Sequence, residues 1–361
     1  MKITLVISSL GPGGAERVAS DIASFWAERG DAVTIMTMED TESDFYPLSD
    51  RVTRMGLSMR NRSANAVAAL LSNLQRIRKL REHFNASRPN FVVSFMDTTN
   101  VVVRLAVIGM KIPVVASEHI DPRHYPIPLA WRLLRRIAYP FMSAVVILTE
   151  SVRPWARRIV GNQRKVWVIP DPIDVRPVAD RTSKVRNSVV AMGRLEPQKG
   201  FDLLLRAFAA CSVTHPGLTL TIYGEGSQRS YLEQLRDELG IKELVSMPGI
   251  TRSPRAAMAR AELFVLSSRY EGLSLVLLEA MAEGTPVLST RCPSGPEEIV
   301  QDGTNGLLVP KEDVQALAGA MDSLMSDGEL RSRLAAVGRT TVQRFSFETI
   351  MPLWDELFAS L

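Results

Sequence analysis

Short apolar runs rich in valine and isoleucine alternate with segments of helical periodicity along the chain. Antiparallel strands can be joined by a tight turn, whereas parallel strands need a crossover connection, usually a helix. The alternation therefore predicts an α/β protein with doubly wound parallel sheets. The predicted strands are residues 3–10, 32–38, 91–96, 114–117, 145–149 and 166–169, followed by 188–192, 218–223, 263–267, 286–289 and 306–309.

A chain of 361 residues exceeds one ordinary domain and favours two α/β halves. Residues 170–177 are Pro-Asp-Pro-Ile-Asp-Val-Arg-Pro, and this density of proline and charge predicts an interdomain hinge. We therefore expect one domain at 1–172 and a second at 173–345. The segment 346–361 carries apolar side chains at helical spacing, so it predicts an amphipathic helix with a buried stripe.

Composition is that of a globular enzyme, because 46% of the residues are hydrophobic and 23% are charged. Cys211 and Cys292 lack metal-ligand spacing, so we expect a reducing compartment, no disulfide and no zinc. No apolar run approaches the roughly 20 residues of a membrane-spanning helix. The run 3–10 leads into a glycine loop and is too short for a signal peptide. We expect a cytoplasmic protein with peripheral membrane contact.

Charge is distributed unevenly between the halves. Residues 1–175 hold 23 Lys and Arg against 16 Asp and Glu, whereas the remainder holds 20 against 23. The basic half indicates an anionic partner. Nucleic acid is not the expected partner, because its binding motifs are absent from the sequence and aromatic residues are few. An anionic membrane surface or a pyrophosphate-bearing acceptor is the simpler expectation.

The segment 66–84 combines an apolar stripe with basic side chains, of which Arg76, Lys79 and Arg81 are singled out. Two interpretations stay open. One is an ordinary amphipathic surface helix. The other is an interfacial helix that draws the domain to anionic lipid and to the pyrophosphate of an acceptor, each basic residue adding about 1 kcal/mol.

Two glutamates and two basic residues have spacings that suit a nucleotide-sugar site. Glu271 precedes the segment 275–281, which predicts a buried helix, and Glu279 lies within that helix. Five residues of helix advance about 7 to 8 Å, so one carboxylate can accept hydrogen bonds from the sugar and the other from the ribose. Arg194 and Lys199 lie in a loop after a predicted strand. From the residues alone, a solvated face that complements the helix dipole is an equal alternative.

The start of the same helix adds backbone donors. Gly272 and Ser274 supply a flexible turn and a candidate N-cap. Amides in the first turn of a helix have no intrahelical partner and bind anions. We therefore expect the diphosphate of a donor to lie against Gly272, Leu273, Ser274 and Leu275.

A glycine loop at residues 11–14 follows the first predicted strand and allows a phosphate or sugar to approach backbone amides. A dinucleotide site of an NAD(P)-dependent oxidoreductase is one alternative, with Glu39 or Asp40 as the ribose partner. Against it, Glu16 stands where a third glycine would allow close packing of helix and strand. The second half of the chain would also have no role.

The run Gly-Arg-Leu-(x)3-Lys-Gly at 193–200, with Glu-Gly-Leu-(x)5-Glu at 271–279, resembles the signature of the family 4 retaining glycosyltransferases. The resemblance covers nearly the whole chain. It implies the GT-B fold, in which two Rossmann-like domains face each other and the last helix crosses back to the first domain. It also implies an acceptor-binding first domain and a nucleotide-sugar-binding second domain.

The resemblance implies roles for further residues. Gly13 and Gly14 would face the donor diphosphate. His119, at the carboxyl end of the strand 114–117, would lie near the transferred sugar, although its position alone favours a hydrogen-bonded loop histidine. UDP is the nucleotide that the resemblance implies. The loop 247–250, which ends at Ile250, would offer backbone groups to its base, and from the residues alone GDP is an alternative at the same loop.

Three shorter runs, at 93–100, 117–119 and 131–140, are similar to bacterial N-acetylgalactosaminyltransferases that extend undecaprenyl-linked oligosaccharides, and to exopolysaccharide transferases. This similarity implies a polyprenyl-pyrophosphate-linked glycan as acceptor. It also implies a role in polysaccharide biosynthesis at the inner face of the plasma membrane.

The implied reaction is departure of a nucleoside diphosphate from the anomeric carbon and capture by an acceptor hydroxyl on the same face. Arg194 and Lys199 would stabilise the leaving diphosphate. The sequence contains no Asp-x-Asp pair, so we expect neither a metal ion nor another cofactor. The competing functions are glycoside hydrolysis by Glu271 and Glu279, which the burial expected for Glu279 disfavours, and a non-enzymatic sugar- or lipid-binding module.

Overall fold

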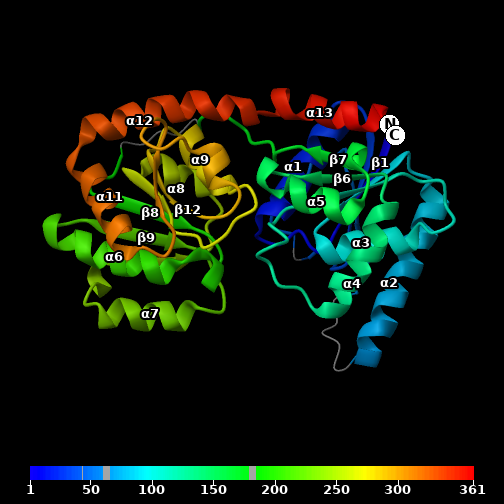
Figure 1. Ribbon diagram of the computed structural model, residues 1–361, viewed down its shortest axis with the longest axis horizontal. Helices are drawn as coiled ribbons and strands as arrows, with labels where there is room; N and C mark the ends of the chain where they lie inside the picture. Colours follow the sequence, from blue (N-terminus) through cyan, green and yellow to red (C-terminus); the bar gives the residue numbers. More distant parts are fainter. Residues whose placement is uncertain (43, 60–65, 179–183) are drawn as a thin grey trace. The chain divides into compact units, whose positions relative to one another are not determined.

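The computed structural model describes residues 1–42, 44–59, 66–178 and 184–361. Contacts divide the chain into two compact units, which are coloured along the sequence in Figure 1. Unit 1 comprises Met1–Pro172 and Met351–Leu361, and unit 2 comprises Ile173–Ile350. The division between Pro172 and Ile173 lies within the proline-rich segment 170–177.

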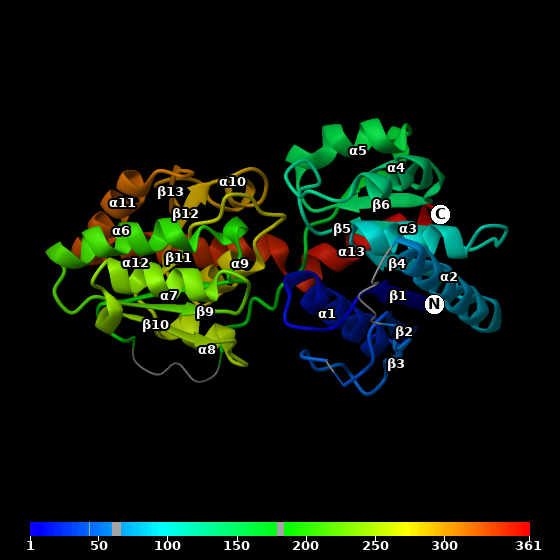
Figure 2. The ribbon, with the colours of Figure 1, turned by 90° about the horizontal axis from the view of Figure 1, so that it is seen from below.

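Unit 1 contains a seven-stranded parallel sheet in the order β3-β2-β1-β4-β5-β6-β7, which Figure 2 shows from β6 to β3. The strands are β1 (Lys2–Ile7), β2 (Ala32–Thr37), β3 (Thr53–Gly56), β4 (Phe91–Phe95), β5 (Val114–Glu118), β6 (Ala144–Ile147) and β7 (Val166–Val168). The helices are α1 (Gly14–Glu28), α2 (Ala66–Ser87), α3 (Asp97–Ala106), α4 (Leu129–Ala138), η1 (Tyr139–Phe141), η2 (Glu150–Val152), α5 (Arg153–Val160) and η3 (Gln163–Lys165). The predicted α/β architecture is confirmed for this half.

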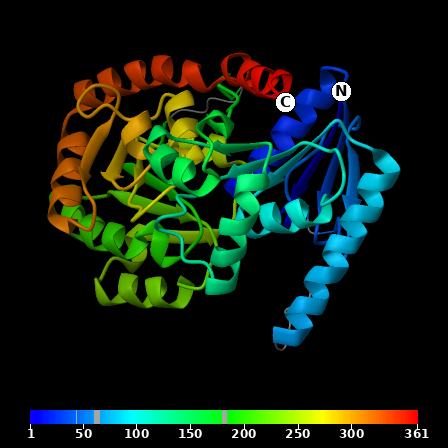
Figure 3. The same ribbon diagram turned by 45° about the vertical axis from the view of Figure 1, so that its right-hand side comes forward.

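Helices cover both faces of this sheet, because its central strands are apolar on both sides. On one face, α2, α3 and α5 pack over a core that includes Val92, Val103 and Val145. The helix α2 is the longest in the unit, and Figure 3 shows its first turns extending beyond the sheet. The strand order reverses between β1 and β4, which is the point where doubly wound sheets bind ligands at the carboxyl ends of their strands.

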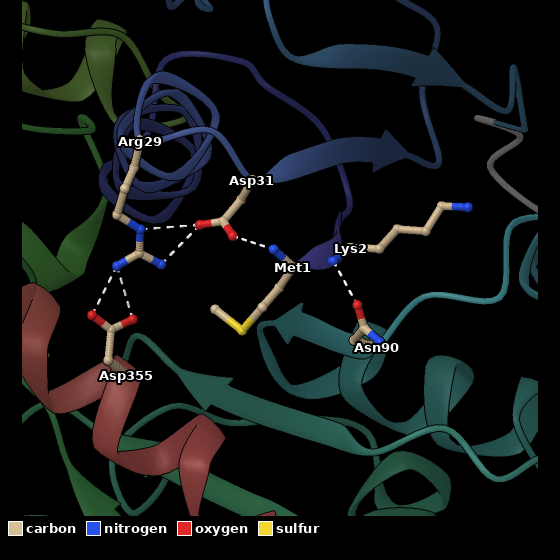
Figure 4. A network of polar contacts seen from close by, with 6 residues as sticks. All are labelled: Met1, Lys2, Arg29, Asp31, Asn90 and Asp355. Carbon is tan, nitrogen blue, oxygen red and sulfur yellow. Dashed lines mark hydrogen bonds and ion pairs between the residues drawn. The ribbon is translucent and has the colours of Figure 1, made fainter.

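The C-terminal helix α13 (Phe347–Ala359) packs against unit 1. Trp354 meets Trp26 of α1 edge to face at 5.7 Å between ring centroids, and Phe358 stacks on Phe91 of β4 at 4.5 Å. At the rim, both carboxylate oxygens of Asp355 accept hydrogen bonds from Arg29, at 2.9 and 2.8 Å (Figure 4). The expected return of the last helix to the first domain is therefore confirmed.

Unit 2 contains a six-stranded parallel sheet in the order β10-β9-β8-β11-β12-β13. The strands are β8 (Ser188–Met192), β9 (Thr219–Tyr223), β10 (Val245–Gly249), β11 (Leu263–Leu266), β12 (Val287–Arg291) and β13 (Leu307–Pro310). The helices are η4 (Pro197–Lys199), α6 (Phe201–Thr214), α7 (Arg229–Glu238), η5 (Lys242–Leu244), α8 (Pro254–Arg260), α9 (Leu275–Ala282), α10 (Pro296–Ile299), α11 (Val314–Ser326), α12 (Gly328–Thr341) and η6 (Val342–Phe345). The order again reverses, here between β8 and β11.

Two strands were not predicted, and both lie at an edge of their sheet. The strand β3 carries only intermediate or exposed side chains, so it lacks the apolar run that marks a buried strand. The strand β10 includes Pro248. The expectation of a loop at 247–250 was wrong for residues 247–249, which belong to this strand. Proline is tolerated at a sheet edge, where it removes no ladder hydrogen bond. Residues 314–341 form two helices, α11 and α12, because the side chain of Asp327 caps the start of α12.

Candidate functional site

The predicted donor residues of unit 2 lie on two loops that leave neighbouring strands. Arg194 and Lys199 follow β8, and Glu271 follows β11, which pairs with β8. Parallel neighbours end at the same edge of a sheet, so the two loops meet there. Gly200 permits the contact: its φ is +62°, and a Cβ there would lie 2.2 Å from the carbonyl oxygen of Ser267.

Lys199 and Glu271 form a direct ion pair. The Lys199 Nζ lies 2.6 Å from Glu271 Oε1, and the two side chains are 14% and 6% exposed. The hydroxyl of Ser268 also donates to Glu271 Oε1, at 2.5 Å. Because a Lys ammonium has three donors, two protons remain for other acceptors. The structure thus brings two predicted residues together, and it adds Ser268, which sequence reasoning missed.

Arg194 is exposed and reaches the same loop indirectly. Its guanidinium donates to Gln198 Oε1 at 3.2 Å, and Gln198 Nε2 donates to the carbonyl of Tyr270 at 2.9 Å. Gln198 is buried and connects the loop after β8 to the loop after β11. It was not singled out in the sequence, although it lies within the motif 193–200.

The start of α9 has the predicted position and the predicted N-cap residue, but no capping hydrogen bond from its side chain. Ser274 is the N-cap residue, with a left-handed φ of 41°, and its side chain makes no capping hydrogen bond. Its hydroxyl is buried and has no hydrogen-bond partner among the described residues. Gly272 is partly exposed, whereas Leu273 is buried. The amides of Leu275 and its neighbours are the first-turn donors that a helix leaves for an anion.

Glu279 and Ile250 are the remaining predicted residues of unit 2. Glu279 is 3% exposed and lies inside the apolar helix α9, as the sequence indicated. Ile250 follows β10 and is 45% exposed. The ribose contact of Glu279 and the base contact near Ile250 stay predictions.

The glycine loop of unit 1 leads into α1, with Gly13 as its N-cap and Gly14 as the first helical residue. A Cβ on Gly13 would lie 2.1 Å from Glu16 Oε2, so the Glu16 carboxylate lies directly over this glycine. A carboxylate in the first turn complements the positive end of the helix dipole. The proposed approach of a diphosphate to Gly13 and Gly14 would therefore require the Glu16 side chain to move.

His119 is held on both ring nitrogens. Ser117 Oγ lies 3.0 Å from Nε2, and Asp171 Oδ1 lies 3.2 Å from Nδ1. A carboxylate can only accept, so Nδ1 donates to Asp171. The ring also stacks on Phe95 at 5.0 Å between centroids. Asp171 was assigned only to the hinge segment, and its contact with His119 required the folded chain.

A buried polar cluster surrounds Glu118, which precedes His119 in the chain. Glu118 is 2% exposed, and its Oε1 accepts a hydrogen bond from the hydroxyl of Tyr139. Asn100 Nδ2 donates to the same hydroxyl at 3.0 Å. Burial raises the pKa of Glu118 to about 7, and the nearby charge of Arg135 opposes this shift. Sequence reasoning missed this cluster, although Glu118 stands within the quoted run Ser-Glu-His.

The basic residues singled out on α2 contact backbone carbonyls. Arg76 donates to the carbonyl of Met59 at 3.1 Å and Lys79 to that of Leu57 at 3.1 Å. Arg81 donates to the carbonyl of Ile108 at 2.6 Å. These side chains thus bind α2 to neighbouring loops, and their membrane role stays a prediction.

A different helix of unit 1 exposes a row of apolar side chains. Leu129, Leu133 and Ile137 on α4, with Phe141 of η1, are between 52% and 65% exposed. Arg132 and Arg136 on α4 are exposed beside this row. No helix within the described ranges is both long and apolar enough to cross a membrane.

Family models match both halves of the chain. The family described as glycosyltransferase family 4 matches residues 12–176, and the one described as glycosyl transferases group 1 matches residues 178–341. Two curated relatives come from Campylobacter jejuni. One is named as a GalNAc-α-(1→4)-GalNAc-α-(1→3)-diNAcBac-PP-undecaprenol α-1,4-N-acetyl-D-galactosaminyltransferase and is 30% identical over 100% of this chain and 99% of its own. The other is named as an N-acetylgalactosamine-N,N′-diacetylbacillosaminyl-diphospho-undecaprenol 4-α-N-acetylgalactosaminyltransferase and is 26% identical over 95% of both chains.

Solved structures share the fold. HepE from Anabaena in complex with UDP-glucose superposes with a TM-score of 0.82 over all of both chains, at 22% sequence identity. This likeness, together with the two parallel sheets, establishes a GT-B architecture.

Proposed function

Because the chain belongs to the family 4 glycosyltransferases, we propose that it transfers a hexose or N-acetylhexosamine from a UDP-sugar to a lipid-linked glycan. The observation that most supports a donor site in unit 2 is the Lys199–Glu271 ion pair, which lies where the strand order of the unit 2 sheet reverses. The UDP-glucose in the HepE complex supports UDP as the nucleotide of the donor. The undecaprenol-linked acceptors named for the Campylobacter relatives support an undecaprenyl-pyrophosphate-linked oligosaccharide as acceptor.

Lys199 and the first-turn amides of α9 are proposed to stabilise the leaving diphosphate. The ammonium keeps two donors beyond its bond to Glu271, and helix N-terminal amides favour phosphate oxygens. Arg194 adds a second cation, oriented by Gln198. Preorganised donors of this kind act where charge develops in the transition state.

Glu271 is proposed to accept from hydroxyls of the transferred sugar, and Glu279 from the ribose. His119, oriented by Asp171, is proposed as a residue that positions the transferred sugar. The new bond forms on the face that the nucleotide leaves, with retention of configuration and without a metal ion. The anomeric configuration of the product, measured by NMR, tests retention. Turnover in the presence of a chelator tests independence of a metal ion.

An anionic membrane is the proposed partner of unit 1. The apolar row of α4 and η1, flanked by Arg132 and Arg136, has the composition of an interfacial helix, whereas the basic groups of α2 are hydrogen-bonded to backbone. The proposal therefore places α4 at the lipid surface. Peripheral attachment at the inner face of the plasma membrane would bring the enzyme to its acceptor.

A panel of UDP- and GDP-sugars, incubated with the purified enzyme, tests the main proposal. The expected result is slow release of UDP from one UDP-sugar, faster release when a lipid-linked acceptor is added, and a glycosylated product. Glu279→Gln should weaken the binding of both UDP and the UDP-sugar, whereas Glu271→Gln should spare UDP. Preference for a GDP-sugar would overturn the assignment of UDP as the nucleotide. If no lipid-linked glycan receives a sugar, the assignment of the acceptor is overturned.

A further inference from the structure

Unit 1 contains a cavity of about 300 Å³ that the donor site does not use. It lies among α2, α3, α4 and the ends of β1 and β2. Its polar wall is formed by Ser8, Glu39, Asn73, Arg76, Thr98 and Thr99. Trp131 of α4 completes the wall with a large aromatic surface.

The cavity lies where a doubly wound sheet binds ligands. Ser8 follows β1, Glu39 follows β2, and Thr98 stands in the first turn of α3, directly after β4. The order of strands reverses between β1 and β4. A ligand in this cavity would thus meet the carboxyl ends of several strands, as in other open α/β sheets.

The groups that line the cavity match a neutral, hydroxyl-rich ligand. Serine and threonine hydroxyls and the amide of Asn73 can both donate and accept, as sugar hydroxyls do. The Glu39 carboxylate adds a strong acceptor. The indole of Trp131 offers an apolar face with a polar N–H, which suits the apolar face of a sugar ring.

A diphosphate fits the same wall poorly. Among the described residues that line the cavity, Arg76 is the only cationic side chain. Its guanidinium already donates to Asn73 Oδ1 at 3.0 Å and to the carbonyl of Met59 at 3.1 Å. The Glu39 carboxylate would repel an anion nearby. These charges select an uncharged ligand.

We propose that this cavity binds one uncharged hexose or N-acetylhexosamine unit of the acceptor glycan, with Trp131 against the ring and Thr98 and Asn73 on its hydroxyls. The inference rests on the proposed function, since that function supplies a glycan acceptor. A volume at the lower end of the usual range of about 300–1,000 Å³ suits a single sugar unit. Arg76 then orients Asn73 and does not contact lipid.

Ligand-observed NMR with methyl α-glycosides of glucose, galactose, N-acetylglucosamine and N-acetylgalactosamine tests the site without UDP-sugar. The wild type should bind at least one glycoside. Trp131→Ala and the nearly isosteric Thr98→Val should each weaken that binding about tenfold or more. Leu134→Ala, at an exposed position of the same helix, is the matched control and should bind as the wild type does. All three variants should keep the UDP affinity of the wild type, because the proposed UDP site belongs to unit 2.

Three outcomes would overturn the inference: no glycoside binds the wild type, Thr98→Val in its folded form binds as the wild type does, or inorganic pyrophosphate displaces the glycoside at equal concentration. Failure of the proposed function has a different signature. In that case no sugar nucleotide is hydrolysed, while glycoside binding and its loss in the variants persist.

Discussion

Lys199 is the residue on which the donor chemistry most depends, because its ammonium is both positioned by Glu271 and left with free donors. Lys199→Ala should lower turnover by on the order of 10², since loss of one positioned cation costs about 3 kcal/mol of transition-state stabilisation. Release of UDP in a continuous assay measures this effect. Lys242→Ala, an exposed lysine of the same unit, is the control and should keep full turnover.

Removing Lys199 also leaves the buried Glu271 carboxylate without its cation, which destabilises the fold. Thermal unfolding of the variant therefore has to accompany its kinetics. Arg194→Ala avoids this complication, because Arg194 is exposed, and a similar loss of turnover is expected. If both variants turn over normally, these cations do not act on the leaving group.

Glu118 makes unit 1 sensitive to pH. Burial raises the pKa of its carboxyl to about 7, above the ordinary value of 4.5. The folded state therefore binds the proton more tightly than the unfolded state. The stability from this proton is fully present below about pH 4.5 and is lost as the pH rises through 7.

Glu118→Gln should remove this dependence. Between pH 5 and pH 8, the wild type should lose up to about 3 kcal/mol more of its free energy of unfolding than the variant. Urea unfolding at the two pH values measures the difference. Glu82→Gln, which changes an exposed glutamate on α2, should follow the wild type. Parallel curves for the wild type and Glu118→Gln would contradict the prediction.

Among the helices and strands, α13 is the one for which we predict the largest loss of unfolding free energy on a single substitution. Trp354 is 2% exposed and packs on Trp26, whereas Asp355 forms a rim ion pair with Arg29 whose side chains are 44% and 33% exposed. Trp354→Ala should destabilise unit 1 by about 3 to 5 kcal/mol. Asp355→Ala should cost about 1 kcal/mol or less, because exposed ion pairs are screened by solvent.

Denaturant unfolding followed by fluorescence compares the two α13 variants. Equal losses of stability would contradict the prediction that the aromatic contact contributes more than the ion pair. The sequence predicted this element from its apolar spacing alone. The partners Trp26 and Phe91 lie more than 250 residues away in the chain and were not identifiable from that spacing.

For the whole molecule, the excess of basic residues in the first half predicts electrostatic attraction to anionic membranes. Leu133→Glu with Ile137→Glu should abolish binding to anionic liposomes, because it places charge in the exposed row of α4. Binding by the wild type should fall steeply with salt, since screening acts over about 10 Å at 0.1 M. Sedimentation with liposomes measures both effects.

Val213→Glu, at an exposed apolar position of unit 2, is the control for added charge. The reversal of Arg76, Lys79 and Arg81 to glutamate is a poorer test, because it also removes hydrogen bonds to backbone carbonyls. Hydrolysis of free UDP-sugar should be unchanged in the α4 variant. Unchanged sedimentation of that variant at low salt would exclude α4 as the docking element.

The sequence by itself determined the alternation of strands and helices, the amphipathic last helix and the motif that carries Lys199 and Glu271. These features are local, since they depend on side-chain periodicity and on spacing within short segments. It did not reveal β3 or β10, because an edge strand has one neighbour and needs no continuous apolar run.

Only the tertiary structure decided which distant groups meet. The contact of Asp171 with His119, the link through Gln198, the cluster around Glu118 and the cavity beside Trp131 each join segments from different strands or helices. The same holds for the hydrogen bonds of Arg76, Lys79 and Arg81, whose sequence pattern indicates an exposed basic face. Such contacts depend on which chain ends the sheets bring together, and one-dimensional spacing does not contain that information.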